Sequence, residues 1–269
     1  MIPKKKNFNL INKKKIDVIF NALHGKGGED GVAQSYFEYL GIPYTHSGVV
    51  SSFNSMNKLI SKQIFLKKKI LTPKHFSING HEYKISTLRE IIKKKNIKFP
   101  IVVKPVNEGS SLGVKICKNF KSLISSSKKL FKKYDKIIFE KYIPGQEVQV
   151  AIINNKALGA IELIPKRAFY DYKAKYTKGA KTKHVMPARL TKKNYNEVLR
   201  ISKLAHNALG CRGVTRSDFK FYNNKFYLLE LNTQPGMTNL SLVPEIANYC
   251  GINFSNLVEQ ILLDASINR

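Results

Sequence analysis

The chain has 269 residues and carries 47 Lys and Arg against 18 Asp and Glu, which gives a formal net charge of +29. Its hydrophobic fraction of 43% is enough for a buried core and excludes a disordered chain. No signal peptide and no run of about eighteen apolar residues is present, so we expect a soluble, cytoplasmic protein without a membrane partner.

The surplus of positive charge raises the question of a nucleic-acid partner, because basic patches mark nucleic-acid-binding surfaces. The lysines, however, form short runs along the whole chain, such as residues 4–6 and 93–95, and arginine is rare. Abundant Lys, Asn, Ile, Phe and Tyr without any Trp indicate a coding bias towards A and T. We therefore predict that no nucleic acid is bound. Cys117, Cys211 and Cys250 fit neither a disulfide framework nor a zinc site, and we expect buried thiols.

The first half of the chain reads as strands and helices separated by glycine and proline. Residues 16–23, "IDVIFNAL", are expected to form a buried strand that ends in a Gly-rich turn. "VAQSYFEYLGIPY" predicts a helix closed by Gly41 and then a short strand, which makes a unit of α/β type. Residues 55–69 have the spacing of one helix, which Pro73 stops from continuing. "FPIVVKPVNEGSSLGVKIC" predicts two strands around a Gly/Ser loop.

The second half begins with an amphipathic helix at 120–134 and a strand in "KIIFEKYI". A hairpin that turns at Asn154-Asn155, a helix at about 192–209 and a helical C-terminal tail are also expected. Residues 166–183 are polar, rich in Tyr and without periodicity. They predict a long loop, and long loops inside compact domains often act as lids.

Two segments near the C-terminus hold acidic residues in a chain that has few. Residues 214–222 and 226–232 alternate like half-buried strands, and the Asn residues between them tolerate a tight turn. With a three-residue turn at 223–225, Asp218 lies opposite Glu230 and Arg216 opposite Asn232. The other face then collects five apolar residues: Phe219, Phe221, Tyr227, Leu229 and Leu231. A two-residue turn would instead put the carboxylates on opposite faces.

Like charges directly opposite on a sheet are unfavourable, so a cation is expected between Asp218 and Glu230. Asp, Glu and Asn oxygens are the ligands that Mg²⁺ prefers. The alternative is a solvent-facing hairpin whose acids pair with lysines.

Other segments have the residue types of a nucleotide site. Lys104 precedes the Gly/Ser loop "NEGSSLG", whose backbone N–H groups and hydroxyls could contact phosphate oxygens, although such a loop alone is an ordinary turn. Lys58 alone reads as a solvated helix lysine. "FEKYIPGQEVQV" adds an apolar strand with Glu140 and Glu147, which suit an adenine edge and ribose hydroxyls. Together these segments predict a metal-dependent ATP enzyme.

Eight segments, in order, resemble the D-alanine–D-alanine ligases, which are ATP-grasp enzymes: "HGKGGEDG", "HSGV", "SMNK", "VKPVNEGSSLGV", "EKYIPGQEVQV", "FYDYKAKY", "GVTRSDF" and "LLELNTQPGMTNLSLVP". The resemblance implies an α/β fold, α+β in the C-terminal part, with a truncated N-terminal Rossmann-like domain. It implies that residues 1–50 are a remnant of the N-terminal substrate domain. Residues 51–139 would be the central ATP-grasp subdomain, and residues 140–269 the C-terminal subdomain with the metal site.

The resemblance also implies site residues. Those implied for ATP are Lys58, Lys104, Ser110, Ser111, Glu140, Lys141, Ile143, Glu147 and Lys175. Those implied for two Mg²⁺ (or Mn²⁺) ions are Asp218, Glu230 and Asn232. An oxyanion hole would come from Arg216 and the backbone N–H of Gly236. The amino-acid site would be formed by His24, Glu29, Ser241 and Leu242, with Tyr176 in the loop above it.

The implied reaction joins two molecules of D-alanine through an acylphosphate, at the expense of ATP, for peptidoglycan synthesis. The usual state of the family implies a homodimer. Two alternatives stay open: a related carboxylate–amine ligase with another second substrate, and a non-catalytic basic binding protein.

Members of this family begin with a strand and a Gly-rich loop whose glutamate anchors the first D-alanine. Here residues 1–15 contain no acid and no glycine. The resemblance therefore implies an N-terminally shortened chain with an intact ATP site. Either the true start lies upstream, or the protein is a reduced enzyme with weak D-alanine binding.

Overall fold

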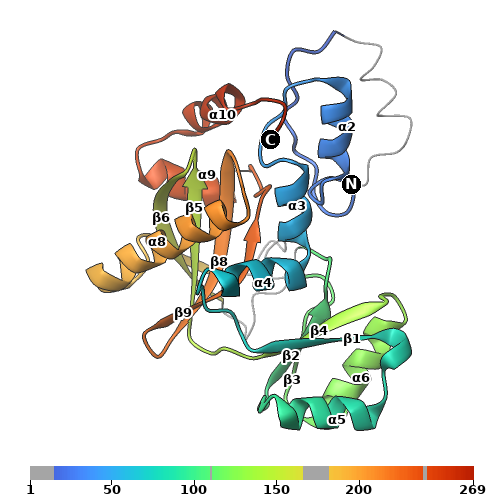
Figure 1. The fold of residues 1–269 in the computed structure, drawn as a ribbon. Coiled ribbons are helices and arrows are strands. Elements are labelled where there is room, and N and C mark those ends of the chain that lie inside the picture. Colours follow the sequence, from blue (N-terminus) through green and yellow to red (C-terminus); the bar gives the residue numbers. More distant parts are fainter. Residues whose placement is uncertain (1–14, 110, 166–181, 239–240) are drawn as a thin grey trace.

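The computed structural model describes residues 15–109, 111–165, 182–238 and 241–269. In this part of the chain two antiparallel sheets, each with its own helices, follow a small helical N-terminal unit (Figure 1). Helices and strands are both present, as the sequence predicted.

The N-terminal unit is built around α2 (Val32–Leu40), which ends at Gly41 as expected, with Gly41 in the left-handed conformation at φ 64. The strand expected at residues 16–23 is reduced to one parallel bridge between Ile19 and Tyr44. The ladder stops because the next amide, that of Asn21, donates to the side-chain oxygen of Thr45 at 3.0 Å instead of to a backbone carbonyl.

The single helix expected at 55–69 is also a wrong prediction, because two helices cover this region: α3 (Val49–Met56) and α4 (Lys58–Lys67). Asn57 between them has an extended backbone, and its side chain accepts hydrogen bonds from the amides of Leu59 and Ile60. It is therefore the N-cap of α4. Lys58 and Lys62 consequently lie one turn apart on a helix that begins at Lys58.

The smaller sheet has the order β1-β4-β2-β3 and consists of β1 (His75–Asn79), β2 (Ile101–Pro105), β3 (Lys115–Cys117) and β4 (Lys136–Lys141). Helices α5 (Ile85–Lys94) and α6 (Phe120–Phe131) pack on one face of it (Figure 1). A short 3-10 helix, Gly80–Glu82, follows β1. The predicted helix at 120–134 is thus present and ends at Phe131.

The larger sheet has the order β7-β6-β5-β8-β9 and consists of β5 (Gln146–Ile153), β6 (Lys156–Ile164), β7 (Lys183–Val185), β8 (Val214–Tyr222) and β9 (Lys225–Asn232). Helices α4 and α8 (Lys192–Ala208) share an apolar core with one face. Helices α9 (Leu242–Tyr249) and α10 (Phe254–Leu263) share a second core with the other. The predicted hairpin turn at Asn154-Asn155 joins β5 and β6.

The acidic hairpin turns over two residues, Asn223 and Asn224, with φ of 49 and 54, and not over the three that we expected. Asp218 nevertheless pairs with Glu230, and Arg216 with Asn232, as predicted. A bulge supplies the extra residue, since Phe219 pairs with Leu228 and leaves Leu229 without an opposite residue.

The bulge also changes the apolar face of β9. Phe226, Leu228 and Leu231 are buried in the core, whereas Tyr227 and Leu229, which we expected there, are only partly buried. The predicted assignment of Tyr227 and Leu229 was therefore wrong, because a bulge shifts every side chain before it to the opposite face.

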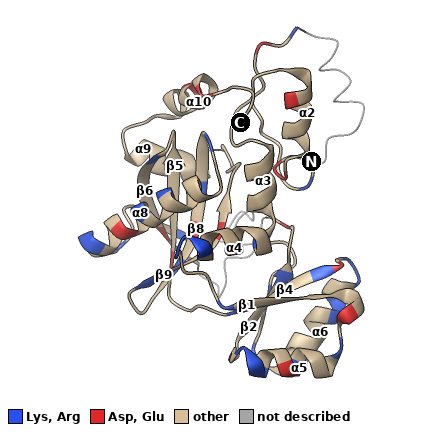
Figure 2. Ribbon diagram, in the orientation of Figure 1, with Lys and Arg blue, Asp and Glu red and all other residues tan. Residues whose placement is uncertain are grey.

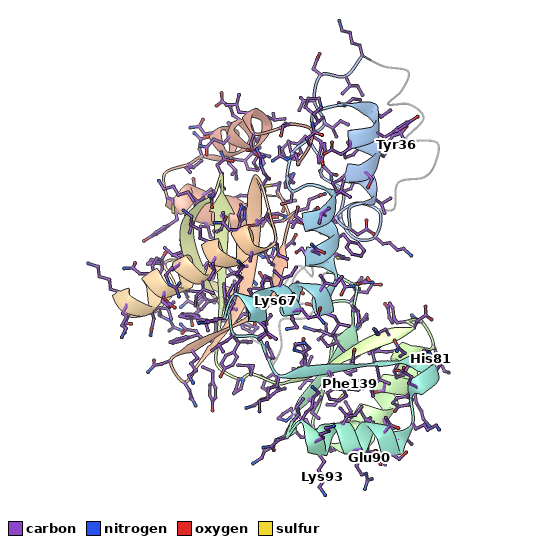
Figure 3. The ribbon with its side chains drawn as sticks, in the orientation of Figure 1. Tyr36, Lys67, His81, Glu90, Lys93 and Phe139 are labelled. Carbon is purple, nitrogen blue, oxygen red and sulfur yellow. The ribbon has the colours of Figure 1, made fainter. Side chains whose placement is uncertain are left out.

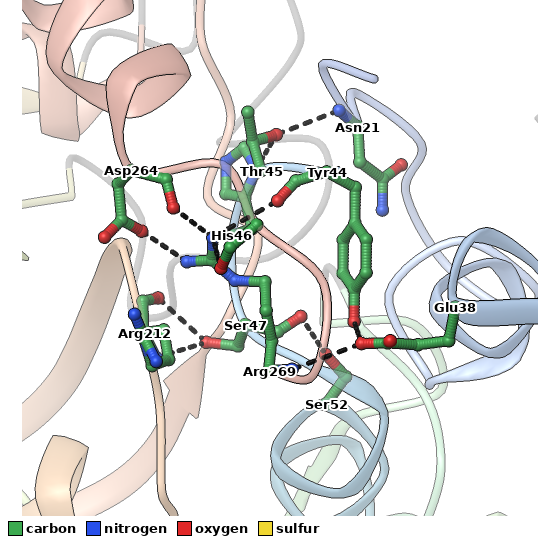
Figure 4. Close-up of polar contacts among 11 residues, drawn as sticks. Asn21, Glu38, Tyr44, Thr45, His46, Ser47, Ser52, Arg212, Asp264 and Arg269 are labelled. Carbon is green, nitrogen blue, oxygen red and sulfur yellow. Dashed lines mark hydrogen bonds and ion pairs between the residues drawn. The ribbon is translucent and has the colours of Figure 1, made fainter. Parts of the chain in front are cut away.

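The C-terminal residues are tied to the N-terminal unit (Figure 4). The guanidinium of Arg269 is fully buried, pairs with Asp264 and donates to the backbone carbonyl of Tyr44 at 3.2 Å. The hydroxyl of Tyr44 donates to Glu38 at 2.7 Å. The two ends of the described chain thus share one polar network.

The expected division between residues 139 and 140 falls inside β4, so we propose to place it after Lys141, where the chain leaves the smaller sheet. Cys117 and Cys211 are buried as expected, but Cys250 is exposed at the end of α9.

Among the described residues, no helix is both long and apolar enough to cross a membrane.

Candidate active site

A pocket of about 820 Å³, partly open to solvent, lies where the two sheets meet. The smaller sheet contributes Val102, Lys104 and Glu140, and the larger sheet contributes Glu147, Asp218 and Glu230. Nine residues that the sequence assigned to ATP or metal line it: Lys58, Lys104, Ser111, Glu140, Lys141, Ile143, Glu147, Asp218 and Glu230. Segments more than 170 residues apart in sequence are thus brought to one cavity.

Glu140 is a buried carboxylate held by two lysines. Its Oε2 atom lies 2.8 Å from the ammonium of Lys104, and its Oε1 atom lies 3.0 Å from that of Lys62. Burial acts to raise the pKa of Glu140, but the two lysines hold it at about 2. Sequence reasoning missed Lys62, although its position four residues after Lys58 on α4 was a signal that both lie on one helix face.

Glu147 and Lys220 form an ion pair at 3.0 Å on the pocket side of β5 and β8. Lys220 was also missed, although it lies two residues after Asp218 and therefore shares its face. Glu147, the carboxylate expected to bind ribose, is thus paired with the ammonium of Lys220.

The carboxylates of the hairpin are each held by a cation. The guanidinium of Arg216 contacts both oxygens of Asp218, at 2.7 and 2.9 Å. The ammonium of Lys58 lies 3.4 Å from Glu230 and donates to the backbone carbonyl of Glu108 in the Gly/Ser loop. Lys58 is buried, so the sequence-based description of it as a solvated lysine was wrong.

The donor set of the hairpin suits a hard cation. Within the described ranges no group of three or more His, Cys, Asp and Glu could hold a metal ion, so the protein offers two carboxylates and the amide of Asn232. Mg²⁺ typically binds through one or two carboxylates, water and substrate phosphates. Asp218, Glu230 and Asn232 therefore fit Mg²⁺ that is completed by a nucleotide.

The loop with His24 and Glu29 reaches the Gly/Ser loop. Glu29 accepts a hydrogen bond from the amide of Gly25 at 2.9 Å, and His24 lies 3.9 Å from its carboxylate. A side chain at Gly109 would come within 2.9 Å of Glu29. His24 and Glu29 do not line the pocket described above but adjoin its Gly/Ser loop.

A buried amide cluster connects this loop to the end of β9. The amide of Asn21 donates to Gln234 at 2.8 Å, and Gln234 donates to the carbonyl of Leu23. The backbone amide of Gln234 donates to the side chain of Asn232 at 2.8 Å. Sequence reasoning missed Asn21 and Gln234, because nothing local indicates that residues 213 positions apart touch.

Gly236, Ser241 and Leu242 follow β9. A side chain at Gly236 would come within 2.8 Å of the hydroxyl of Ser241, so only glycine fits there without a shift. Leu242 is buried in the core beneath α9, so its side chain does not face the pocket. Ser110, Lys175 and Tyr176 lie outside the described residues.

Comparison with known proteins identifies the family. The sequence profile of the D-ala D-ala ligase C-terminus matches residues 67–263, and that of the D-ala D-ala ligase N-terminus matches residues 2–47. The D-alanine–D-alanine ligase of Pelagibacter ubique (strain HTCC1062) is 59% identical over 255 residues, which are 95% of this chain and 83% of that protein. The chain belongs to the D-alanine–D-alanine ligase family.

Other members of the family agree in sequence and in structure. The D-alanine–D-alanine ligase of Geotalea uraniireducens (strain Rf4) is 45% identical over 94% of this chain and 79% of its own. The crystal structure of the Bacillus anthracis ligase has a TM-score of 0.86 at 36% identity and covers 98% of this chain and 84% of its own. A D-alanine–D-alanine ligase from Bacillus anthracis complexed with ATP has a TM-score of 0.83 at 32% identity and covers 97% of this chain and 82% of its own. The predicted ATP-grasp fold and the assignment to the ligases are thereby confirmed.

Proposed function

We propose that this chain joins two molecules of D-alanine to D-alanyl-D-alanine at the expense of ATP, for peptidoglycan precursor synthesis. One observation carries the proposal: in a member of this ligase family, a single pocket collects four lysines and the carboxylates of Glu140, Glu147, Asp218 and Glu230. Cations suit the phosphates of ATP, and the opposed carboxylates suit the metal that accompanies them.

ATP lies in the pocket between the sheets. Lys58 and Lys104 contact its phosphates, with Ser110, Ser111 and Lys175 completing the phosphate contacts. Glu140, Lys141 and Ile143 contact adenine, and Glu147 contacts the ribose. The burial of Glu140 and Ile143 supports this assignment, because an adenine edge needs polar groups within an apolar site.

Asp218, Glu230 and Asn232 would hold two Mg²⁺ (or Mn²⁺) ions, which would supply positive charge to neutralise the transferred phosphate. The cations that hold these carboxylates in the structure, Arg216 and Lys58, then face the phosphate.

The reaction has two steps. A carboxylate oxygen of the first D-alanine attacks the γ-phosphorus of ATP, the bond to the β-phosphate oxygen breaks, and ADP leaves. The amine of the second D-alanine attacks the acylphosphate carbonyl, loses a proton, and inorganic phosphate leaves. Arg216 and the backbone N–H of Gly236 stabilise the oxyanion of this second step. No side-chain nucleophile is needed, because positioning and electrostatics carry phosphoryl transfer.

The amino-acid site adjoins the Gly/Ser loop. His24, Glu29 and the hydroxyl of Ser241 contact the D-alanine substrates, and Leu242 contributes through its backbone, since its side chain is in the core. Tyr176 covers the second D-alanine and favours an amine as nucleophile. The family also supports a homodimer in the cytoplasm, with no nucleic acid and no membrane bound.

Phosphate release from ATP with D-alanine, L-alanine or D-lactate supplied in turn tests the proposal. We expect release with D-alanine and Mg²⁺, a dipeptide product, and no release without a metal. Release with another carboxylate–amine pair alone would instead favour the related ligase. Stabilisation by polyanions without Mg²⁺, and no turnover, would favour a non-catalytic basic binder.

Tyr176→Phe tests the choice of the second nucleophile. We expect D-lactate to form a larger share of the product than in the wild type when both acceptors are supplied. Tyr39→Phe, on the exposed surface of α2, is the matched control. An unchanged product ratio in the Tyr176 variant would contradict this role.

A further inference from the structure

Lys62 is a lysine with no access to solvent. Its side chain is 0% exposed, and its ammonium lies 3.0 Å from Oε1 of Glu140. Among the described residues it has no other anionic partner, and it does not line the pocket. A charged side chain is almost never buried so completely unless it is paired with a group of opposite charge.

Lys104 contacts the other oxygen of the same carboxylate, with its ammonium 2.8 Å from Oε2. Unlike Lys62, Lys104 lines the pocket. Glu140 thus has one lysine behind it, from α4, and one lysine beside the cavity, from β2.

The two lysines differ in what they can do when a phosphate arrives. Lys104 can turn from Glu140 to a phosphate oxygen only if the buried carboxylate keeps a cation. An uncompensated buried charge is strongly unfavourable, whereas Glu140 paired with Lys62 stays neutralised. Lys62 itself is enclosed and stays where it is.

We propose that Lys62 is a positioning residue that balances the charge of Glu140 and thereby frees Lys104 for the nucleotide phosphates. The inference rests on the proposed function, in which Lys104 binds those phosphates. With Lys62 and Lys104 beside Glu140, one positive charge remains at the cavity after the carboxylate is neutralised. If Lys104 were alone, its charge would neutralise Glu140 and none would remain.

The protonation of Lys62 agrees with this role. Burial lowers the pKa of Lys62 and the neighbouring Glu140 opposes this shift, so the 3.0 Å contact with the carboxylate favours the ammonium form.

The test compares adenosine with ATP, because the ratio of their dissociation constants isolates the contribution of the phosphates. In Lys62→Met we expect the ratio of the adenosine constant to the MgATP constant to fall about tenfold, with the adenosine constant little changed. The matched control is Lys67→Met, which removes the same charge from the exposed side of α4 (Figure 3) and should leave the ratio within about twofold.

The same comparison in the Glu140→Gln variant decides whether Lys62 acts through Glu140. With a neutral residue at 140, Lys104 is no longer held and Lys62 is no longer required. The double variant Lys62→Met with Glu140→Gln should therefore show the same ratio as Glu140→Gln alone, whatever that substitution does to adenine binding.

Each outcome bears on the inference. A wild-type ratio in Lys62→Met overturns it, and so does an equal tenfold fall in the Glu140→Gln background, which would mean that Lys62 acts without Glu140. A wild-type protein that binds no ATP overturns the proposed function and this inference with it. Circular dichroism melting checks each fold, and Lys62→Gln replaces Lys62→Met if the latter does not fold.

Discussion

Asp218 and Glu230 face one another across β8 and β9, but their counter-ions differ. Asp218 has a two-point contact with Arg216, whereas Glu230 has the longer 3.4 Å contact with Lys58. Removing either carboxylate relieves their repulsion, and loss of Asp218 also breaks its close, largely buried ion pair with Arg216. The two residues should therefore be equal for activity and unequal for stability.

We expect Asp218→Asn and Glu230→Gln each to reduce turnover at least about a hundredfold, since each loses a metal ligand. Without Mg²⁺ the melting temperature should fall for Asp218→Asn and hold or rise slightly for Glu230→Gln. Phosphate release measures the turnover, and differential scanning fluorimetry measures the melting temperature. Glu259→Gln, on α10, is the control and should change neither. Near-normal turnover in either site variant would rule out the metal role.

His206 gives stability a pH dependence. Burial lowers the pKa of His206 to about 4, and its Nδ1 atom lies 2.8 Å from the hydroxyl of Thr215. Between pH 6.5 and 4 the unfolded state binds the proton that the folded state does not. The contribution is therefore present above pH 6.5 and is lost as the pH falls to 4.

At full loss this contribution is on the order of 3 kcal/mol. Urea unfolding at pH 7 and pH 4.5 should show a smaller acid loss in His206→Gln than in the wild type. His81→Gln, at an exposed position, is the control and should keep the wild-type loss. His46, whose pKa burial lowers to about 3, contributes in the same direction in all three proteins. Equal acid losses in wild type and His206→Gln would refute the assignment.

At the scale of elements, the end of β9 and the loop before α2 are joined through Gln234. Gln234 and Asn21 are both buried, and the side chain of Gln234 accepts from Asn21 and donates to Leu23. His24 follows Leu23 directly, so the cluster sets where the loop with His24 and Glu29 lies relative to the β8–β9 hairpin.

We expect Gln234→Leu to destabilise the protein by about 1–3 kcal/mol for each buried partner left without a hydrogen bond. It should also raise KM for D-alanine more than KM for ATP, because the loop with His24 and Glu29, which we propose contacts D-alanine, moves and the pocket lysines do not. Urea unfolding and steady-state kinetics measure these effects. Gln63→Leu, on the exposed side of α4, is the control. An unchanged KM for D-alanine would show that the cluster does not position the loop.

At the scale of the whole molecule, positive charge is spread over much of the chain, whereas α2, α9 and α10 contain acidic residues and no Lys or Arg. Lys and Arg lie on both sheet layers and on helices α4, α5 and α8, and acidic residues are few (Figure 2). A net charge of +29 opposes compaction through self-repulsion, which salt screens.

Raising NaCl from about 50 to 500 mM should therefore raise the melting temperature by about 2–4 °C, which corresponds to roughly 1 kcal/mol for a chain of this size. Equal concentrations of KCl should act alike, because screening does not depend on the cation. A melting temperature that is flat or falls with both salts would indicate that surface ion pairs outweigh the repulsion.

The sequence by itself determined the elements whose signals are local. Helices α2, α6 and α8 follow from apolar periodicity with a cap at one end, and the β5–β6 hairpin follows from alternation around Asn154-Asn155. The order of the family motifs also singled out nine of the residues that line the pocket. These signals lie within ten to twenty residues of chain, where hydrogen bonding and side-chain direction repeat at a known period.

Only the tertiary structure decided which of these residues meet and how each charge is balanced. The bulge at Leu229 sets the register of the acidic hairpin, and it exists because both faces of β9 must match their neighbours. In the sequence Lys62 resembles any other helix lysine, and only the packing of β4 places Glu140 against its ammonium. Asn21 likewise lies in a strand-like pattern, and only the fold brings Gln234, 213 positions away, into contact with it. Burial of a polar group depends on what packs over it, and packing between distant segments leaves no period in the sequence.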